Sequence, residues 1–258
     1  MGGLPSLTNI SPIANLRDLR TLSINDCKAI STLPETKNLK KLERITLSRL
    51  PLVGDFTPIG RVRQLADLRI TNCEQLGDLD FVSELRSLRT LRIEGATRIK
   101  DIRPASNLTA LSEFVIARCS ELEDITALAA LSNLERVRLV SCRKLADLSP
   151  LAKLRNLKEI TLVDCASVKS LSPLSNNFGL EKIRLGELDS KRMQIPEVLL
   201  PRVESTNMLF AHSTGLHFED DHFYYRYYDF DEPLFVYRHG VEMEVVPMFP
   251  DETDIDLE

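Results

Sequence analysis

Leucines return at one fixed interval along most of the chain. Eight of them are each 23 residues apart with no insertion between them: Leu19, Leu42, Leu65, Leu88, Leu111, Leu134, Leu157 and Leu180. A fixed period of about 20 to 30 residues is typical of solenoids, in which each repeat buries its apolar face only by stacking on its neighbours. The pattern therefore predicts a stack of coils of equal length.

Residues 134–156, LERVRLVSCRKLADLSPLAKLRN, show what one coil contains. Apolar and polar residues alternate from Val137 to Leu139, as expected for a short strand with one buried face. Ser149-Pro150 then marks a turn, and the LAKL that follows favours a short helical or 3₁₀ segment. The same kind of mark recurs in the return half of other coils, as Ser11-Pro12, Thr57-Pro58, Arg103-Pro104 and Ser172-Pro173.

This arrangement resembles the leucine-rich repeat family, and within it the short internalin type, whose return half reads D-I-S-P-L-A-N-L. The counterparts here are Asn9–Leu16, Asp147–Leu154 and Lys169–Leu174, and the resemblance covers residues 4 to about 188. It implies an α/β solenoid, a horseshoe of about eight coils. A parallel sheet would line the concave face, short 3₁₀ or helical segments the convex side, and a β-rich cap would close the C-terminal end.

The position at which each coil bends departs from the family, because that subtype usually carries asparagine there. Here the column reads Cys27, Leu50, Cys73, Ala96, Cys119, Cys142, Cys165 and Leu188, and it holds all five cysteines. We interpret each cysteine as a small buried hydrophobe whose S–H donates weakly to the turning backbone. A disulfide between Cys142 and Cys165 and a metal site are the alternatives.

Two columns of side chains should project from the concave face of the stacked strands. The first is Thr21, Arg44, Asp67, Thr90, Glu113, Arg136, Glu159 and Lys182; the second is Ser23, Thr46, Arg69, Arg92, Val115, Arg138, Thr161 and Arg184. Seven of these residues are basic and three acidic, although the net charge of the chain is −5. One interpretation is a solvated face of mixed charge.

The functional interpretation is that this face receives an acidic protein surface, since the guanidinium fork pairs bidentately with carboxylates. The candidate binding residues are Arg44, Arg69, Arg92, Arg136, Arg138 and Arg184. Beside them, Ala117, Val140 and Val163 form a small apolar strip that would suit the centre of an interface.

The repeat fades after Leu188, which divides the chain into a solenoid at 1–188 and an aromatic-rich C-terminal cap or extension with an acidic tail at 189–258. The second part holds all four histidines and all five tyrosines. His239-Gly240 predicts a hairpin turn between two strands. Capping the last coil is one role for this region. A second contact surface is the other, through Tyr224, Tyr225, Tyr227 and Tyr228.

A cluster of histidines and carboxylates between His217 and His222 matches no zinc signature, so we expect no metal and no cofactor. The other end of the chain begins with half a coil, from Leu4 to Ile13. This half-coil is a cap, the end of a solenoid cut from a longer chain, or an exposed end that pairs with a second copy.

Composition and missing motifs narrow the function further. The negative net charge and the lack of aromatics among the basic residues argue against nucleic acid. No stretch is apolar enough to cross a bilayer and no signal peptide is recognisable, so we expect no membrane association and a cytoplasmic location in the producing or a recipient cell. The common phosphate-binding, zinc-binding and serine-hydrolase motifs do not occur, so we expect that this protein is not an enzyme.

The sequence therefore predicts a non-catalytic protein–protein interaction module that binds through its basic concave face, its aromatic C-terminal region, or both. One specific form is an immunity or inhibitor protein that neutralises a toxin or enzyme. The alternative is a delivered bacterial effector, or the sensor portion of a larger signalling protein, in which the repeats select the target.

Overall fold

The structure is a computed structural model of the whole chain and describes residues 3–186, 188 and 193–205, together with four short strands further on. The chain divides into two compact units, Met1–Asn207 and Met208–Glu258. The first unit is a leucine-rich repeat solenoid, as the 23-residue period predicts. The domain boundary placed at residue 188 stays a prediction.

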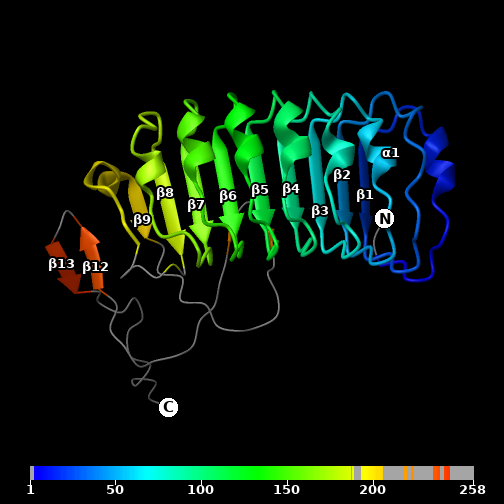
Figure 1. Cartoon of the computed structure of the whole chain (residues 1–258). Helices are drawn as coiled ribbons and strands as arrows, with labels where there is room; N and C mark the ends of the chain where they lie inside the picture. The colour runs from blue at the N-terminus through cyan, green and yellow to red at the C-terminus, as the bar shows by residue number, and fades with distance from the viewer. Residues whose placement is uncertain are drawn as a thin grey trace, which may run out of the picture. The chain divides into compact units, whose positions relative to one another are not determined.

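Nine parallel strands stand side by side in chain order in the first unit (Figure 1). They are β1 (Thr21–Asn25), β2 (Arg44–Ser48), β3 (Asp67–Thr71), β4 (Thr90–Glu94), β5 (Glu113–Ala117), β6 (Arg136–Val140), β7 (Glu159–Val163), β8 (Lys182–Gly186) and β9 (Val203–Ser205). From β1 to β8, each residue pairs with the one 23 positions further along the chain, for example Thr21 with Arg44. The repeat period thus sets the register of the sheet.

Short helical turns connect the strands on the return side of the coils. They are η1 (Ser11–Asn15), α1 (Thr57–Gly60), η2 (Asp80–Val82), η3 (Arg103–Asn107), η4 (Thr126–Ala130), η5 (Ser149–Lys153), η6 (Ser172–Leu174) and η7 (Glu197–Arg202). Proline stands at the first or second position of five of them, as in η1 and η5, because its fixed φ suits a helix start where no N–H is needed.

An acidic or amide side chain starts most of these turns. In η5, Asp147 Oδ1 accepts a hydrogen bond of 2.7 Å from the backbone N–H of Ser149. Asp55, Asp78, Asp101 and Asp124 do the same for the residue two positions on. This local turn is the physical reason for the aspartate in the D-L-S-P-L pattern.

The interior is an aliphatic column that runs through all the coils. In each strand from β1 to β8 the second and fourth residues point inward and are buried, such as Leu68 and Ile70 in β3. The leucines of the 23-residue series from Leu42 to Leu180 are buried as well. At the first coil, by contrast, Leu4 and Leu16 are exposed beside the end strand β1. Pairing of that end with a second copy stays a prediction.

The cysteine column lies in this interior, and all five thiols are free and buried. Each Sγ donates to the carbonyl oxygen two residues before it, for example from Cys119 to Ala117 at 3.5 Å and from Cys165 to Val163 at 3.5 Å. The interpretation of these residues as small hydrophobes with a weak donor to the turning backbone is therefore confirmed.

The sheet continues past the last regular coil in a way that the repeat did not predict. β9 pairs in parallel with β8, but Ile183 lies opposite Val203, so this last coil is shorter than 23 residues. Before it, Gln194 N–H donates to the carbonyl of Lys169 at 2.8 Å, which carries the return segment along the stack. The last coil therefore remains hydrogen-bonded without repeating the leucine pattern.

The second unit contains two small antiparallel pairs. β10 (Phe218–Glu219) pairs with β11 (His222–Phe223), and β12 (Phe235–Arg238) pairs with β13 (Val241–Glu244). Arg238 lies opposite Val241, as the predicted hairpin at His239-Gly240 requires. The cap role of this unit stays a prediction.

Candidate protein-binding face

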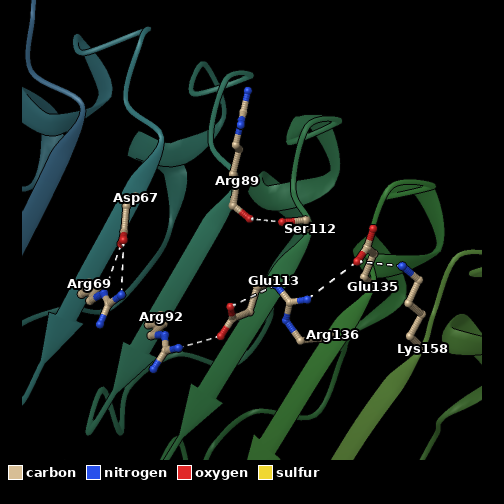
Figure 2. A network of polar contacts seen from close by, with 9 residues as sticks. All are labelled: Asp67, Arg69, Arg89, Arg92, Ser112, Glu113, Glu135, Arg136 and Lys158. Atoms are coloured by element: carbon tan, nitrogen blue, oxygen red, sulfur yellow. Dashed lines mark hydrogen bonds and ion pairs between the residues drawn. The ribbon is translucent and has the colours of Figure 1, made fainter. Parts of the chain in front are cut away.

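The strand register brings the two predicted columns of charged side chains together on the concave face. Arg69 of β3 is the direct neighbour of Arg92 of β4, and Arg136 of β6 is the neighbour of Glu159 of β7. Both predicted columns are therefore present in the sheet, and Figure 2 shows their central part. We call the sixteen residues of both columns the charged face.

Carboxylates in the first column hold arginines of the charged face in place. Asp67 accepts from Arg69 in the same strand, with Nε to Oδ1 at 3.2 Å and Nη2 to Oδ2 at 3.3 Å. Glu113 takes two arginines from the strands on either side (Figure 2): Arg92 at 2.7 Å and Arg136 at 3.6 Å. A third carboxylate, Glu159, pairs with Arg184 of β8.

The pairing continues into the loops that precede the strands. Arg136 also lies 3.7 Å from Glu135, whose carboxylate is 3.3 Å from Lys158 Nζ (Figure 2). Carboxylates thus hold Arg69, Arg92, Arg136 and Arg184 of the charged face in place. A side chain that an ion pair already holds loses less conformational entropy when a partner binds.

The predicted binding arginines differ in how much surface they offer. Arg44 is exposed, and no ion pair joins it to any of the described residues. The Arg69 side chain is 43% exposed, whereas that of Arg92 is only 18% exposed beside Glu113. Arg136, Arg138 and Arg184 are half-buried. A partner that approaches the strands would therefore reach Arg44, Arg69 and Arg136 more easily than Arg92.

The apolar strip and the four tyrosines have less structural support as contact surfaces than the arginines. Val140 and Val163 are only 3% and 5% exposed, so they offer a partner little apolar surface. Tyr224, Tyr225, Tyr227 and Tyr228 lie outside the described residues. Contact of a partner with any of the predicted residues stays a prediction.

A second polar cluster, which the sequence patterns did not reveal, lies where β3, β4 and β5 end. Arg118 forms an ion pair with Glu94 and donates to Asn72 Oδ1 at 3.2 Å, two coils away. Burial raises the pKa of Glu94, and the charge of Arg118 opposes that rise only in part. The one signal in the sequence was Gly95, a glycine at a position that carries a side chain in the other coils from Asp26 to Asp164.

Metal binding and thiol chemistry have little support in the described residues. They contain no group of three or more histidine, cysteine or acidic side chains that could hold a metal ion. Burial raises the pKa of Cys73 to about 11 and that of Cys119 to about 12, which keeps both thiols protonated and weakly nucleophilic. None of the helices in this part of the chain is long and apolar enough to cross a membrane.

Parallel strands in register, 3₁₀ return turns and a leucine column define the class: the described solenoid is a leucine-rich repeat domain. Domains of this class are typically non-catalytic modules that bind other proteins on an extended concave surface. Neither a protein-family model nor a curated protein sequence matches the chain.

Solved structures nevertheless share the fold. An internalin (inlF) from Listeria monocytogenes matches with a TM-score of 0.59 and 22% identity, over 67% of this chain and 50% of that chain. Internalin C2 (inlC2) from the same organism gives 0.56 and 28% identity, over 70% and 77% of the two chains. The leucine-rich repeat domain of the type III effector XCV3220 (XopL) gives 0.63 and 23% identity, over 80% and 72%. The chain thus spans half of the length of the first internalin and more of the other two.

Proposed function

We propose that the charged face binds an acidic surface of a protein partner. The observation that supports this most directly is the segregation of charge: seven basic and three acidic residues share two adjoining columns of a chain whose net charge is −5. Complementary charge of this kind steers a partner and fixes its register. Arginine suits the role because its planar fork matches a carboxylate and its stem still packs.

The ion pairs of the charged face support the same proposal. Asp67 and Glu113 hold Arg69, Arg92 and Arg136 in defined positions, so their donors are oriented before a partner arrives. Preorganised side chains lose less freedom on binding. Because the exposed part of the contact is electrostatic, the association rate should fall as salt is added.

The experiment is a comparison of charge-reversed full-length proteins in affinity capture from cells of the source organism. The test variant carries Arg44→Glu, Arg69→Glu and Arg136→Glu. The matched control carries Arg17→Glu, Arg86→Glu and Arg155→Glu, three exposed arginines in the loops between the return turns and the strands. Both variants change net charge equally. We expect the test variant to lose its partner by at least about tenfold, roughly 1.4 kcal/mol, and the control to keep it.

A third variant separates the two candidate surfaces. Replacing Tyr224, Tyr225, Tyr227 and Tyr228 by serine leaves the solenoid unchanged in sequence. Retention of the partner by this variant together with its loss by the arginine variant assigns the contact to the charged face. The reverse pattern would move the contact to the C-terminal region and overturn the proposal.

Two biological roles would use such a face. An immunity or inhibitor protein would cover a toxin or enzyme, whereas a delivered effector would use its repeats to select a target. The effector role is the alternative, and its support is the structural similarity to the repeat domain of a type III effector. We place either role in the cytoplasm, a setting that five free thiols suit. Assaying the captured partner with and without this protein distinguishes the roles, because only an inhibitor abolishes its partner's activity.

A further inference from the structure

The residue that follows each strand from β1 to β7 turns the chain in the left-handed backbone region. The φ angles there lie between 48° and 69°, and the residues are Asp26, Arg49, Asn72, Gly95, Arg118, Ser141 and Asp164. Six of the seven project a side chain along the rim of the charged face, at the carboxyl ends of the strands. Gly95 projects none, so the row is interrupted at one place.

The neighbouring coils use the space that Gly95 leaves. Arg118 reaches back across the Gly95 coil to Asn72 and pairs with Glu94 on the way. A Cβ atom on Gly95 would lie only 2.3 Å from Asn72 Oδ1. The contact between Arg118 and Asn72 therefore depends on the missing side chain. Arg118 itself has a left-handed φ of 53°, as the equivalent Arg49 does, so this backbone conformation belongs to the repeat and not to these contacts.

Around Gly95 the surface forms a hollow of about 680 Å³. Its lining is Asn72, Glu74, Gln75, Gly95, Thr97, Arg98 and Arg118. Departure from the repeat and a recess therefore coincide at one place on the rim of the charged face.

The hollow contains more hydrogen-bond donors than free acceptors. Asn72 Oδ1 accepts from Arg118, and Gln75 Oε1 accepts from Arg98 Nη1 at 3.1 Å. The Glu94 carboxylate is held by Arg118. Each guanidinium carries five N–H groups, and these contacts use only a few of them. Arg98 and Arg118 therefore keep N–H groups for which the described residues supply no hydrogen bond.

We propose that this hollow is a binding pocket for one carboxylate, supplied by an acidic side chain of the partner that docks on the charged face. The inference rests on the proposed function and adds a defined pocket to it. A carboxylate matches the guanidinium fork in geometry and gives charge-assisted hydrogen bonds. Arg98 is exposed and Arg118 is part-buried, so the incoming group is partly removed from water as it binds.

Among the described residues that line the hollow, Glu74 is the only carboxylate; no ion pair joins it to the other described residues, and it opposes an incoming anion. Its side chain is exposed and can turn into solvent, where salt and water screen the repulsion. The buried Glu94 carboxylate is neutralised by Arg118. Because Arg118 is paired with Glu94, an incoming carboxylate would be attracted mainly by Arg98 and would also accept from the remaining N–H groups of Arg118.

The test uses small probes and the full-length protein, so it needs no knowledge of the partner. N-acetylglutamate, with its α-carboxyl group blocked as the methylamide so that only the side-chain carboxylate is charged, is titrated while the backbone amide resonances of Gly95, Thr97 and Arg98 are followed by NMR. N-acetylglutamine, with its α-carboxyl group blocked in the same way, has the same shape without the charge and is the probe control. The variants are Gly95→Asn, which fills the hollow with a residue that tolerates a left-handed φ, and Arg98→Gln. The matched variant is Ser141→Asn, at the equivalent position of another coil with φ 51°.

We expect saturable shifts at the hollow with N-acetylglutamate and at least about tenfold weaker binding of N-acetylglutamine. Gly95→Asn and Arg98→Gln should weaken N-acetylglutamate binding by about tenfold or more, while Ser141→Asn leaves it within about twofold. Equal binding of the two probes, or unchanged binding in Gly95→Asn, overturns the pocket. That result leaves the charged face untouched, because its own test is partner capture by the Arg44, Arg69 and Arg136 variant.

Discussion

At the bend of each coil, single side chains satisfy the backbone where the chain changes direction. Internalin-type repeats usually use asparagine there, and five of the coils here use a thiol that donates to a nearby carbonyl. A thiol is a weaker donor than an amide but is far easier to bury. The cysteine column therefore gives up hydrogen-bond strength and gains apolar packing.

Burial should make these thiols unreactive in the native protein. The five cysteines are inaccessible, and desolvation raises the pKa of Cys73 and Cys119. We expect a thiol reagent such as DTNB to modify none of them within minutes at pH 8 and all five after unfolding without reductant. A count of three after unfolding would instead reveal a disulfide, for which Cys142 and Cys165 are the neighbouring pair.

Gly60 is required by packing and not by its backbone conformation. A Cβ atom there would meet the carbonyl oxygen of Phe81 at 2.4 Å, whereas one on Gly54 would find its nearest atom at 3.9 Å. Gly60→Ala should therefore lower the free energy of unfolding by about 1–3 kcal/mol. Gly54→Ala should be neutral or slightly stabilising. Urea denaturation of the two variants compares them, and equal midpoints would contradict the packing argument.

The buried Glu94 should make stability depend on pH. Its pKa is raised above the ordinary glutamate value of 4.5 in the folded protein, so the folded state binds this proton more tightly than the unfolded state. Stability then falls as pH rises from about 4.5 through the native pKa. The difference in unfolding free energy between the wild type and Glu94→Gln should decrease over that window. A difference that is constant or grows with pH would show that Arg118 outweighs burial.

At the scale of elements, the 23-residue period predicted the positions and pairing of β1 to β8, because the face on which a side chain lies and the register of the strands both follow from residue spacing. The sequence placed Arg69 beside Arg92 and Arg136 beside Glu159, and the sheet pairs them so. It could not show which carboxylate holds which arginine, since that depends on side-chain rotamers: Arg92 turns to Glu113 of the next strand, but Arg69 turns to Asp67 of its own. The sequence also showed no sign of β9, because backbone hydrogen bonds hold its coil and the leucine period does not extend to it.

Glu113 connects three strands and should matter more than an exposed ion pair. Its carboxylate serves Arg92 and Arg136, and its side chain is only 12% exposed. Glu113→Gln should cost about 1 kcal/mol, because a part-buried arginine loses its charge partner. The matched Glu84→Gln removes a pair with Arg63 whose atoms are 4.0 Å apart and largely in water, so its effect should be below about 0.3 kcal/mol. Similar midpoints in urea for both variants would show that the network contributes no stability.

At the scale of the whole solenoid, the coils contact mainly their direct neighbours, with the hydrogen bond from Arg118 to Asn72 as an exception, so stability is nearly a sum of coil and interface terms. The charged face carries a second, longer period, because Asp67, Glu113 and Glu159 stand two coils apart in the first column. Removing one coil at Arg136 would bring Glu113 beside Glu159. Removing two coils would keep both the leucine register and the order of charges.

Deletion of residues 111–156, two full periods of 23 residues, tests this additivity. The junction joins Ala110 to Leu157, and β4 then pairs with β7, so Glu159 takes the place of Glu113 beside Arg92. We expect cooperative unfolding, an intact far-UV spectrum and a urea m-value lower by about a quarter, in proportion to the buried surface removed. The control deletes residues 111–145, which leaves η3 and η5 in series with no strand between them. The return segment left without a strand cannot join the sheet, so the protein with this deletion should unfold non-cooperatively. If both deletion variants unfold with equal cooperativity, the coils do not depend on stacking.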